Sequence, residues 1–299
     1  MTTASLGEDR AAKRAPGLRR AGRELLRNPP ALFGAAVLVL FVLVALFAPL
    51  VAPHNPRQQN LGDRFTPPVW DKAGDTRYLL GTDQLGRDIL SRLIYGSRVA
   101  LAVGVFGTGL ALVIGVTLGL CAGYFGGRVD AIVTRITEVI ISIPSSILYI
   151  TILGVFGPSL WLLILVMGLF GWITSARVVR GEVLSIRNRE YVEASIGLGQ
   201  RTPLVLIKHV LPNVLGSIIV VGTLKVASMI ILEASLSFLG FGVQPPAVTW
   251  GQMLSDGRRF ITSSWWLATL PGLAISLLTL SLLFLGNWLR DNFDPRTYD

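Results

Sequence analysis

The residues whose types and spacing could do chemistry gather in one run, EYVEASIGLGQRTPLVLIKHVLPN, residues 190–213. The run is polar and charged, and it stands between two long hydrophobic blocks. Glycines at 197 and 199 would end a short helix, and Pro203 can begin a second helix at its first turn. Pro212 would break the chain before the next block. Two short helices of this kind predict a docking element for another molecule, with a solvated loop at the membrane surface as the plainer alternative.

Catalytic, metal and phosphate chemistry find no support in the sequence. His54 and His209 are far apart, no His-Glu-x-x-His spacing occurs, and Cys121 is the single cysteine. None of the four lysines follows a glycine, so the Gly-Lys pair of a phosphate-binding loop is missing. No nucleophile–base constellation is recognisable either. We therefore expect no catalytic residue, no metal and no cofactor bound by this chain.

Three charged residues, Glu138, Lys225 and Glu233, fall inside hydrophobic runs, where charges are costly and often functional. Arg135 and Glu138 are three residues apart and could simply pair on one helix face. Lys225 and Glu233 are about two helical turns apart and would share a face. They could line a pathway, although a packing or interface role is the favoured alternative. Glu233 is predicted near an outer end, where water could hydrate it.

The elements that must position these residues are hydrophobic helices. The chain has 299 residues, of which 52% are hydrophobic and only 15% charged, and its mean hydropathy is +0.60. Soluble domains carry about 25% charged residues. Several runs exceed the roughly 18–20 residues that cross a bilayer as a helix. The sequence predicts an all-α polytopic membrane protein with six transmembrane helices, at about 31–52, 99–121, 131–156, 160–176, 214–236 and 267–289. Pro144 would break the third, and glycines at 104, 107, 109, 115 and 119 would let the second pack closely.

The net charge of +9 follows the membrane topology. Lysine and arginine cluster in the segment 1–28 and around the polar run, and they are about twice as frequent in the proposed inside segments as in the outside ones. This pattern predicts cytoplasmic N- and C-termini, a cytoplasmic tail at 1–28 and a membrane domain at 29–299. It also predicts an outside loop at 54–97 and an inside loop at 177–212. Because the charges flank hydrophobic runs, nucleic acid is not an expected partner.

The run 190–213 resembles the Glu-Ala-Ala loop in permease subunits of ATP-binding-cassette importers. The matching residues are Glu193-Ala194-Ser195, then Gly199, then Leu211-Pro212. Ser195 replaces an alanine of the family pattern, and His209 stands where many members have isoleucine. Further stretches resemble the second permease of dipeptide and oligopeptide importers. They are LGTDQLGRDILSRLIYGSR, GLCAGYFGGRVD, ARVVRGEVLS, EASLSFLGFGVQPP and WGQML.

This resemblance implies a type I importer permease in a bacterial cytoplasmic membrane. The expected partners are a homologous second permease, two cytoplasmic ATPases that bind ATP and Mg²⁺, an extracytoplasmic substrate-binding protein and a peptide. The inside loop would couple the ATPases to the spans. Its expected coupling residues are Glu190, Tyr191, Glu193, Ala194, Ser195, Gly199, His209, Leu211 and Pro212. Nickel, glutathione or another small solute is the nearest alternative substrate. An ATP-independent channel or ion-coupled carrier is the alternative from another class.

The outside loop carries a second candidate contact, the polar stretch with Asp83, Arg87 and Asp88. These side chains could touch the substrate-binding protein that the resemblance implies. In the favoured alternative they hold the loop together, with Asp83 capping the following helix through a backbone N–H.

Overall fold

A computed structural model of the chain describes residues 24–293, so most of the predicted tail 1–28 lies outside the described residues. The described part is helical, and its only β pairing is an isolated bridge between Thr82 and Asp88. Five of its helices are long and apolar enough to cross a membrane, and a bent pair makes six if it counts as one span. The predicted all-α membrane fold is confirmed.

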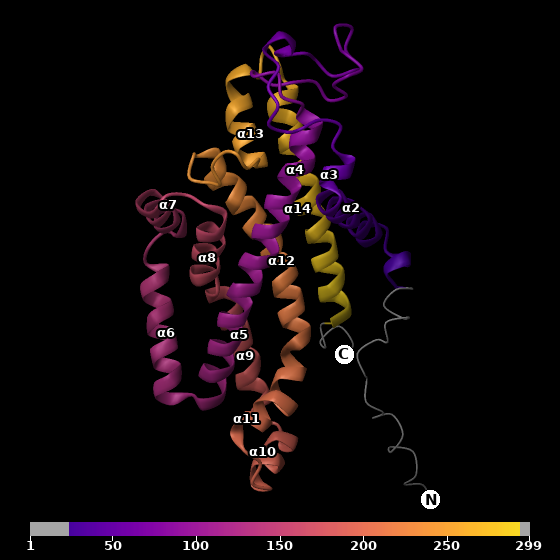
Figure 1. Cartoon of the computed structure of the whole chain (residues 1–299). Coiled ribbons are helices and arrows are strands. Elements are labelled where there is room, and N and C mark those ends of the chain that lie inside the picture. The colour runs from indigo at the N-terminus through magenta and orange to yellow at the C-terminus, as the bar shows by residue number, and fades with distance from the viewer. Residues whose placement is uncertain (1–23, 294–299) are drawn as a thin grey trace, which may run out of the picture.

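The elements follow one another along the chain as Figure 1 labels them. They are α2 (Pro29–Leu46), α3 (Ala48–Val51), η1 (Leu61–Asp63), α4 (Ile89–Ala102), η2 (Val103–Gly107), α5 (Thr108–Phe125), α6 (Gly127–Ile141), α7 (Ser145–Phe156), α8 (Leu160–Gly171), α9 (Ile173–Ile186), α10 (Glu190–Gly197), α11 (Thr202–Val205), η3 (Leu206–Val210), α12 (Leu211–Phe238), α13 (Trp250–Gly257), η4 (Arg258–Phe260) and α14 (Trp266–Phe293). Figure 1 places α10 and α11 at one end of the molecule, and α13 with the long loop before α4 at the other.

The polar stretch predicted as an outside loop at 54–97 ends earlier, because the helix that holds the second span begins at Ile89 and continues to Phe125. Asp88 starts this helix by accepting a hydrogen bond from the backbone N–H of Ser91 at 2.9 Å. The first turns carry polar residues and therefore lack the hydropathy of a span. They form a helix nonetheless. The polar side chains of Arg92 and Ser97 are buried within the molecule, so this part of the helix packs against protein.

The stretch predicted as an inside loop at 177–212 also begins later than predicted. The fourth span runs on through α9 to Ile186, with a small break at Trp172 between α8 and α9. Val179 and Val183 are buried on the inner face of α9. The arginines of this segment obscured its amphipathic pattern, because Arg180 and Arg187 lie half-buried beside the apolar face and only Arg177 is exposed.

Pro212 does not break the chain, contrary to the prediction. Helix runs from Thr202 to Phe238, and the five residues Leu206–Val210 form a π-helical turn immediately before Leu211. Such a turn widens the helix and changes which carbonyl each N–H meets. Pro212 comes directly after this turn, as the second residue of α12, and the irregular turn accommodates its missing N–H.

The remaining spans differ less from their predicted limits. The first ends at Leu46, and a turn at Phe47 leads into α3. The third begins at Gly127 and is bent by 76° around Pro144, where a break was predicted. The fifth is the helix from Thr202 to Phe238 just described, which begins well before its predicted limit, and the sixth is α14.

Glycine sets the contact between α5 and α9, one of the main helix pairs of the fold. A Cβ on Gly119 would lie 2.7 Å from the carbonyl oxygen of Ala176, and one on Gly115 would lie 2.7 Å from that of Trp172. These distances are too short for a side chain, so the two backbones meet directly. The predicted close packing is found at these two positions, whereas Gly109 faces open space.

Candidate functional site

The predicted docking element folds as α10, with a buried face and a broad exposed face. Val192 and Ser195 point inward. Tyr191 and Ile196 flank that inner face and remain 41% and 48% exposed. Glu190, Glu193 and Ala194 are exposed, and Leu198 just beyond the helix is 88% exposed. The helix therefore offers a separate molecule a surface of two carboxylates, a small residue and apolar side chains.

The inner face of α10 is fixed to the membrane helices by a cluster of aliphatic side chains, which we call the valine cluster. Its buried members come from α9, α10, α11, η3 and α12. They are Val179, Val183, Ile186, Val192, Val205, Val210 and Val214. Leu211 packs against it from outside. Because buried side chains pack at crystal-like density, a displacement of α10 is passed on to α9 and α12.

The end of α10 is closed by Gly199, whose φ of +79° suits glycine. The N–H of Gln200 donates to the carbonyl of Ser195 at 3.2 Å, and the N–H of Gly199 donates to that of Ile196 at 2.9 Å. These two bonds form a Schellman motif, which satisfies the free carbonyls of the last turn. The glycine predicted to stop the helix does so at 199.

Gln200 links α10 to the following helix, a role that the sequence interpretation missed. Its side-chain oxygen accepts a hydrogen bond from the hydroxyl of Ser195 and lies 3.1 Å from Nε2 of His209. His209 is half-buried in η3, and its carbonyl accepts a bond from the Asn213 side chain. Ser195, Gln200 and His209 thus form a polar clasp beside the valine cluster. Only the turn at Gly199 brings them together.

The carboxylates of α10 lie in its first turn, where the positive end of the helix dipole favours negative charge. Neither Glu190 nor Glu193 forms an ion pair with a described residue. Pro212 is exposed at the start of α12. Both glutamates are therefore available to a cationic or N–H-bearing partner.

Three polar contacts, all missed from the sequence, hold the helices around α10. Arg180 on α9 forms a two-pronged ion pair with Asp130 on α6, with Nη2 2.6 Å from the carboxylate. Arg187 donates to the carbonyl of Tyr124 at 3.0 Å, near the end of α5. Ser217 donates to Glu182, joining α12 to α9. These partners lie at least 35 residues apart, and no local spacing rule pairs them.

Each charged residue inside the spans has a polar partner within the chain itself. Glu138 pairs with Arg135 at 3.1 Å on an exposed helix face. Lys225 donates to the carbonyl of Gly171 at 2.5 Å, where α8 ends and leaves that carbonyl free. Glu233 is only 1% exposed and accepts a hydrogen bond from Ser237 at 2.6 Å. The expected hydration of Glu233 is wrong, because α12 packs against α13 on this side.

The three candidate residues of the predicted outside loop point into the molecule. Asp83 is buried, accepts from the N–H groups of Leu85 and Arg87, and pairs with the Arg87 side chain at 2.5 Å. Arg87 in turn lies 3.7 Å from Asp256 on α13. Burial raises the pKa of the Asp256 carboxyl, and the nearby Arg87 acts against that rise. The residue that caps α4 is Asp88, so the prediction that Asp83 would do so is wrong.

Among the residues the structure describes, no three His, Cys, Asp or Glu side chains are grouped to hold a metal ion.

Two family models match the chain. The model described as binding-protein-dependent transport system inner membrane component matches residues 115–298. The model described as the N-terminal TM domain of oligopeptide transport permease C matches residues 18–68.

Curated relatives are similar over most of their length. The di/tripeptide transport system permease protein DppC of Pseudomonas aeruginosa is 39% identical over 93% of this chain and 92% of its own. The dipeptide transport system permease protein DppC of Escherichia coli K12 is 41% identical over 90% of each chain. The oligopeptide transport system permease protein OppC of Bacillus subtilis is 39% identical over 90% of this chain and 86% of its own.

Proposed function

The chain belongs to the family of binding-protein-dependent transport system inner membrane components, and from that premise we propose that it is a permease subunit of an ATP-driven importer of short peptides. It forms half of the translocation pathway, and a homologous second permease forms the other half. The names of the relatives support a peptide as the transported solute, because they refer to di/tripeptide, dipeptide and oligopeptide transport. Nickel and glutathione have no such support.

The coupling to ATP runs through α10, and this rests chiefly on its exposed face combined with its rigid base. Tyr191, Glu193 and Ala194 enter a cleft of a separate cytoplasmic ATPase, with Ile196 beside them. Glu193 accepts a charge-assisted hydrogen bond there. The valine cluster and the clasp at Gln200 turn a movement of the ATPase into a movement of α9 and α12.

Two ATPase domains bind ATP and Mg²⁺ and carry out hydrolysis, and this chain is a non-catalytic subunit. An extracytoplasmic binding protein delivers the peptide at the end with α13. Both chain termini and α10 lie in the cytoplasm of a bacterium. The excess of lysine and arginine near α10 supports this orientation.

The test is ATP-dependent uptake of labelled di- and tripeptides into vesicles that hold this chain with its candidate partners. Glu193→Arg should lower uptake roughly tenfold or more, since a charge-assisted contact is lost and a like charge meets the cleft. The control is Asp71→Arg, the same charge change on an exposed loop residue at the opposite end. Co-purification of the ATPases is measured for both variants and should fall only for Glu193→Arg.

Two outcomes would overturn the proposal. Uptake that proceeds without ATP would make the protein a channel or an ion-coupled carrier. Equal uptake by the native protein and Glu193→Arg would show that this glutamate is not part of the coupling contact.

The intramembrane charges have a structural role in this proposal, and the peptide pathway is formed by other residues. Lys225 satisfies a free helix-end carbonyl and Glu233 is enclosed within the chain. Lys225→Met and Glu233→Gln should therefore lower the unfolding temperature and leave the peptide KM of the surviving transporter unchanged. A changed peptide KM at equal membrane abundance would show that these residues line the pathway. Glu138→Gln should likewise leave the peptide KM unchanged, and a changed value would place Glu138 in the pathway.

A further inference from the structure

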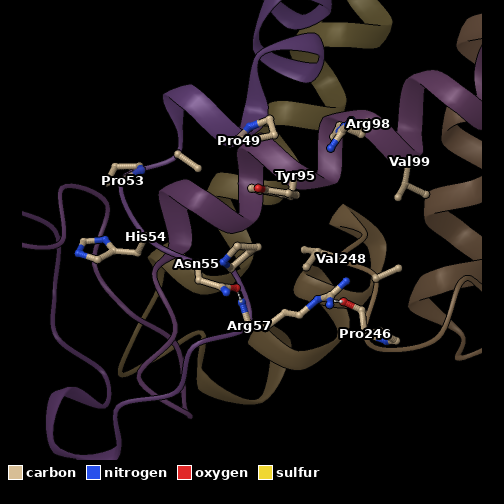
Figure 2. Close-up of a pocket in the computed structure, with 13 residues that line it drawn as sticks. Pro49, Pro53, His54, Asn55, Arg57, Tyr95, Arg98, Val99, Pro246 and Val248 are labelled. Atoms are coloured by element: carbon tan, nitrogen blue, oxygen red, sulfur yellow. Dashed lines mark hydrogen bonds between the residues drawn. The ribbon is translucent and has the colours of Figure 1, made fainter.

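A cavity of about 710 Å³ opens at the end of the molecule opposite α10, where α3, α4 and the loop between α12 and α13 meet. Figure 2 shows its walls. One wall is the segment that leaves α3, another is the face of α4 with Tyr95, Arg98 and Val99, and a third is the loop with Pro246 and Val248. The volume lies within the roughly 300–1,000 Å³ typical of small-ligand sites.

The charge of the cavity is positive. Arg57 and Arg98 both line it, and no aspartate or glutamate does. Both arginines are exposed, and neither forms an ion pair with a carboxylate of the described residues. His54 also contributes to the wall, and a carboxylate oxygen of Asp88 lies 3.5 Å from its Nδ1. Two guanidinium groups thus face a common space, and neither has a carboxylate partner.

The arginines are held in place before any ligand arrives. Nε of Arg57 donates to the carbonyl of Pro246 at 3.1 Å, which leaves the terminal nitrogens free to bind. The guanidinium of Arg98 lies over the ring of Tyr95, 6.0 Å from its centroid. The loop is fixed too, because the Asn55 side chain accepts from the N–H of Arg57 at 3.0 Å. Flanking prolines stiffen it further.

Part of the cavity wall is apolar and stands beside apolar surface. Pro49, Val99 and Val248 contribute hydrocarbon to its walls. Directly next to it, Phe47 and Leu50 at the end of the first span are 50% and 83% exposed. A ligand that fills the site would bring an anionic group to the arginines and hydrocarbon to this surface.

We propose that the cavity binds the phosphate headgroup of an anionic phospholipid from the leaflet opposite α10. The phosphate oxygens accept hydrogen bonds from Arg57 and Arg98, and the acyl chains lie along the exposed end of α2 and α3. Guanidinium groups suit phosphate because their planar N–H fork binds two oxygens together. A transported peptide fits less well, since its ammonium group would find no carboxylate in the wall.

The experiment is native mass spectrometry of the assembled transporter released from nanodiscs made of phosphatidylcholine with a minor fraction of phosphatidylglycerol. We expect phosphatidylglycerol to remain bound to the native protein. The double variant Arg57→Ala/Arg98→Ala should reduce that retention by roughly tenfold, since two charge-assisted contacts are removed. Arg98→Lys should retain an intermediate amount, because it keeps the charge and loses the planar fork.

The matched control is Arg64→Ala, which removes one exposed positive charge from the same outside loop and not from the cavity. It should leave phosphatidylglycerol retention unchanged. Equal retention by the native protein and the double variant, with the complex intact, would overturn the proposal. Retention of inorganic phosphate or glycerophosphoglycerol as strongly as the intact lipid would assign the cavity to a soluble anion instead. Displacement of the lipid by a dipeptide would assign it to the substrate.

Discussion

At the scale of single residues, Gln200 decides how firmly α10 is joined to the chain that follows. Its side-chain oxygen lies between Ser195 and His209 and contacts both. The valine cluster holds α10 against sliding but is non-directional, as apolar contacts are. The polar clasp adds the directional part and fixes the rotation of α10 about its own axis.

Replacing Gln200 by alanine should loosen α10 without unfolding the protein. Loss of the shared acceptor costs about 1 kcal/mol. Amide hydrogen exchange at 191–199 should become roughly fivefold faster, while exchange in α5 and α14 stays the same. Gln58→Ala, at an exposed position outside the clasp, is the control. Unchanged exchange in α10 would show that the valine cluster alone fixes this helix.

The sequence predicted residues well where a conformation is local and poorly where a contact is distant. The end of α10 followed from glycine, because only a left-handed residue closes such a helix. The pair of Arg135 and Glu138 followed from helical spacing. The pair of Asp130 and Arg180 could not be predicted in this way. Their residues are 50 positions apart, and they meet only because the fold brings α6 close to α9.

At the scale of elements, α5 and α9 depend on glycine for their contact. Gly119→Ala should lower the free energy of unfolding by about 1–3 kcal/mol, because its new methyl group would lie 2.7 Å from a backbone oxygen that cannot yield. Thermal unfolding of the purified protein measures the effect.

Gly109→Ala is the matched control for that experiment. It makes the same change in the same helix, gains the same helix propensity and meets no atom within 4 Å. Its unfolding temperature should stay equal or rise slightly. An equal fall in both variants would mean that the glycines act through helix bending rather than through contact.

The ion pair between α6 and α9 should contribute modestly, because its side chains are 37% and 23% exposed. A double-mutant cycle with Asp130→Asn and Arg180→Gln should give a coupling energy of about 1 kcal/mol. Repeating the cycle at high salt should reduce that value. A coupling near zero at low salt would leave α6 held by its apolar contacts alone.

Helix limits were predicted less accurately than helix number. Hydropathy marks the part of a helix that lies in lipid, whereas α4 and α9 continue beyond it as amphipathic helices buried against protein. The break expected at Pro212 failed for a related reason. A proline interrupts a regular α-helix, but the preceding π-turn accommodates the missing N–H of Pro212. The local composition does not predict that turn.

At the scale of the whole molecule, the valine cluster is the mechanical link between α10 and the spans. Val183 is fully buried at its centre. Val183→Ala should cost about 1–2 kcal/mol of stability through the cavity that it leaves. It should also raise the number of ATP molecules hydrolysed per peptide imported, because α10 then moves without moving α9.

Val155→Ala is the control, since this valine on α7 is 74% exposed and its methyl groups support no core. The measurement is uptake and ATP hydrolysis in the same vesicles. A ratio that stays constant in Val183→Ala despite a lower unfolding temperature would separate stability from coupling, and would assign the link to the clasp at Gln200.

The unbroken passage of the chain through Pro212 has a mechanical consequence. The helix from Thr202 to Phe238 contains 37 residues, which corresponds to a rod of about 55 Å. One end adjoins α10 and the other adjoins α13. Pivoting such a rod by about 5° at its base carries its tip through about 5 Å. In the function proposed above, this helix would therefore act as a lever arm, because a small movement at α10 becomes a larger movement at the end near α13.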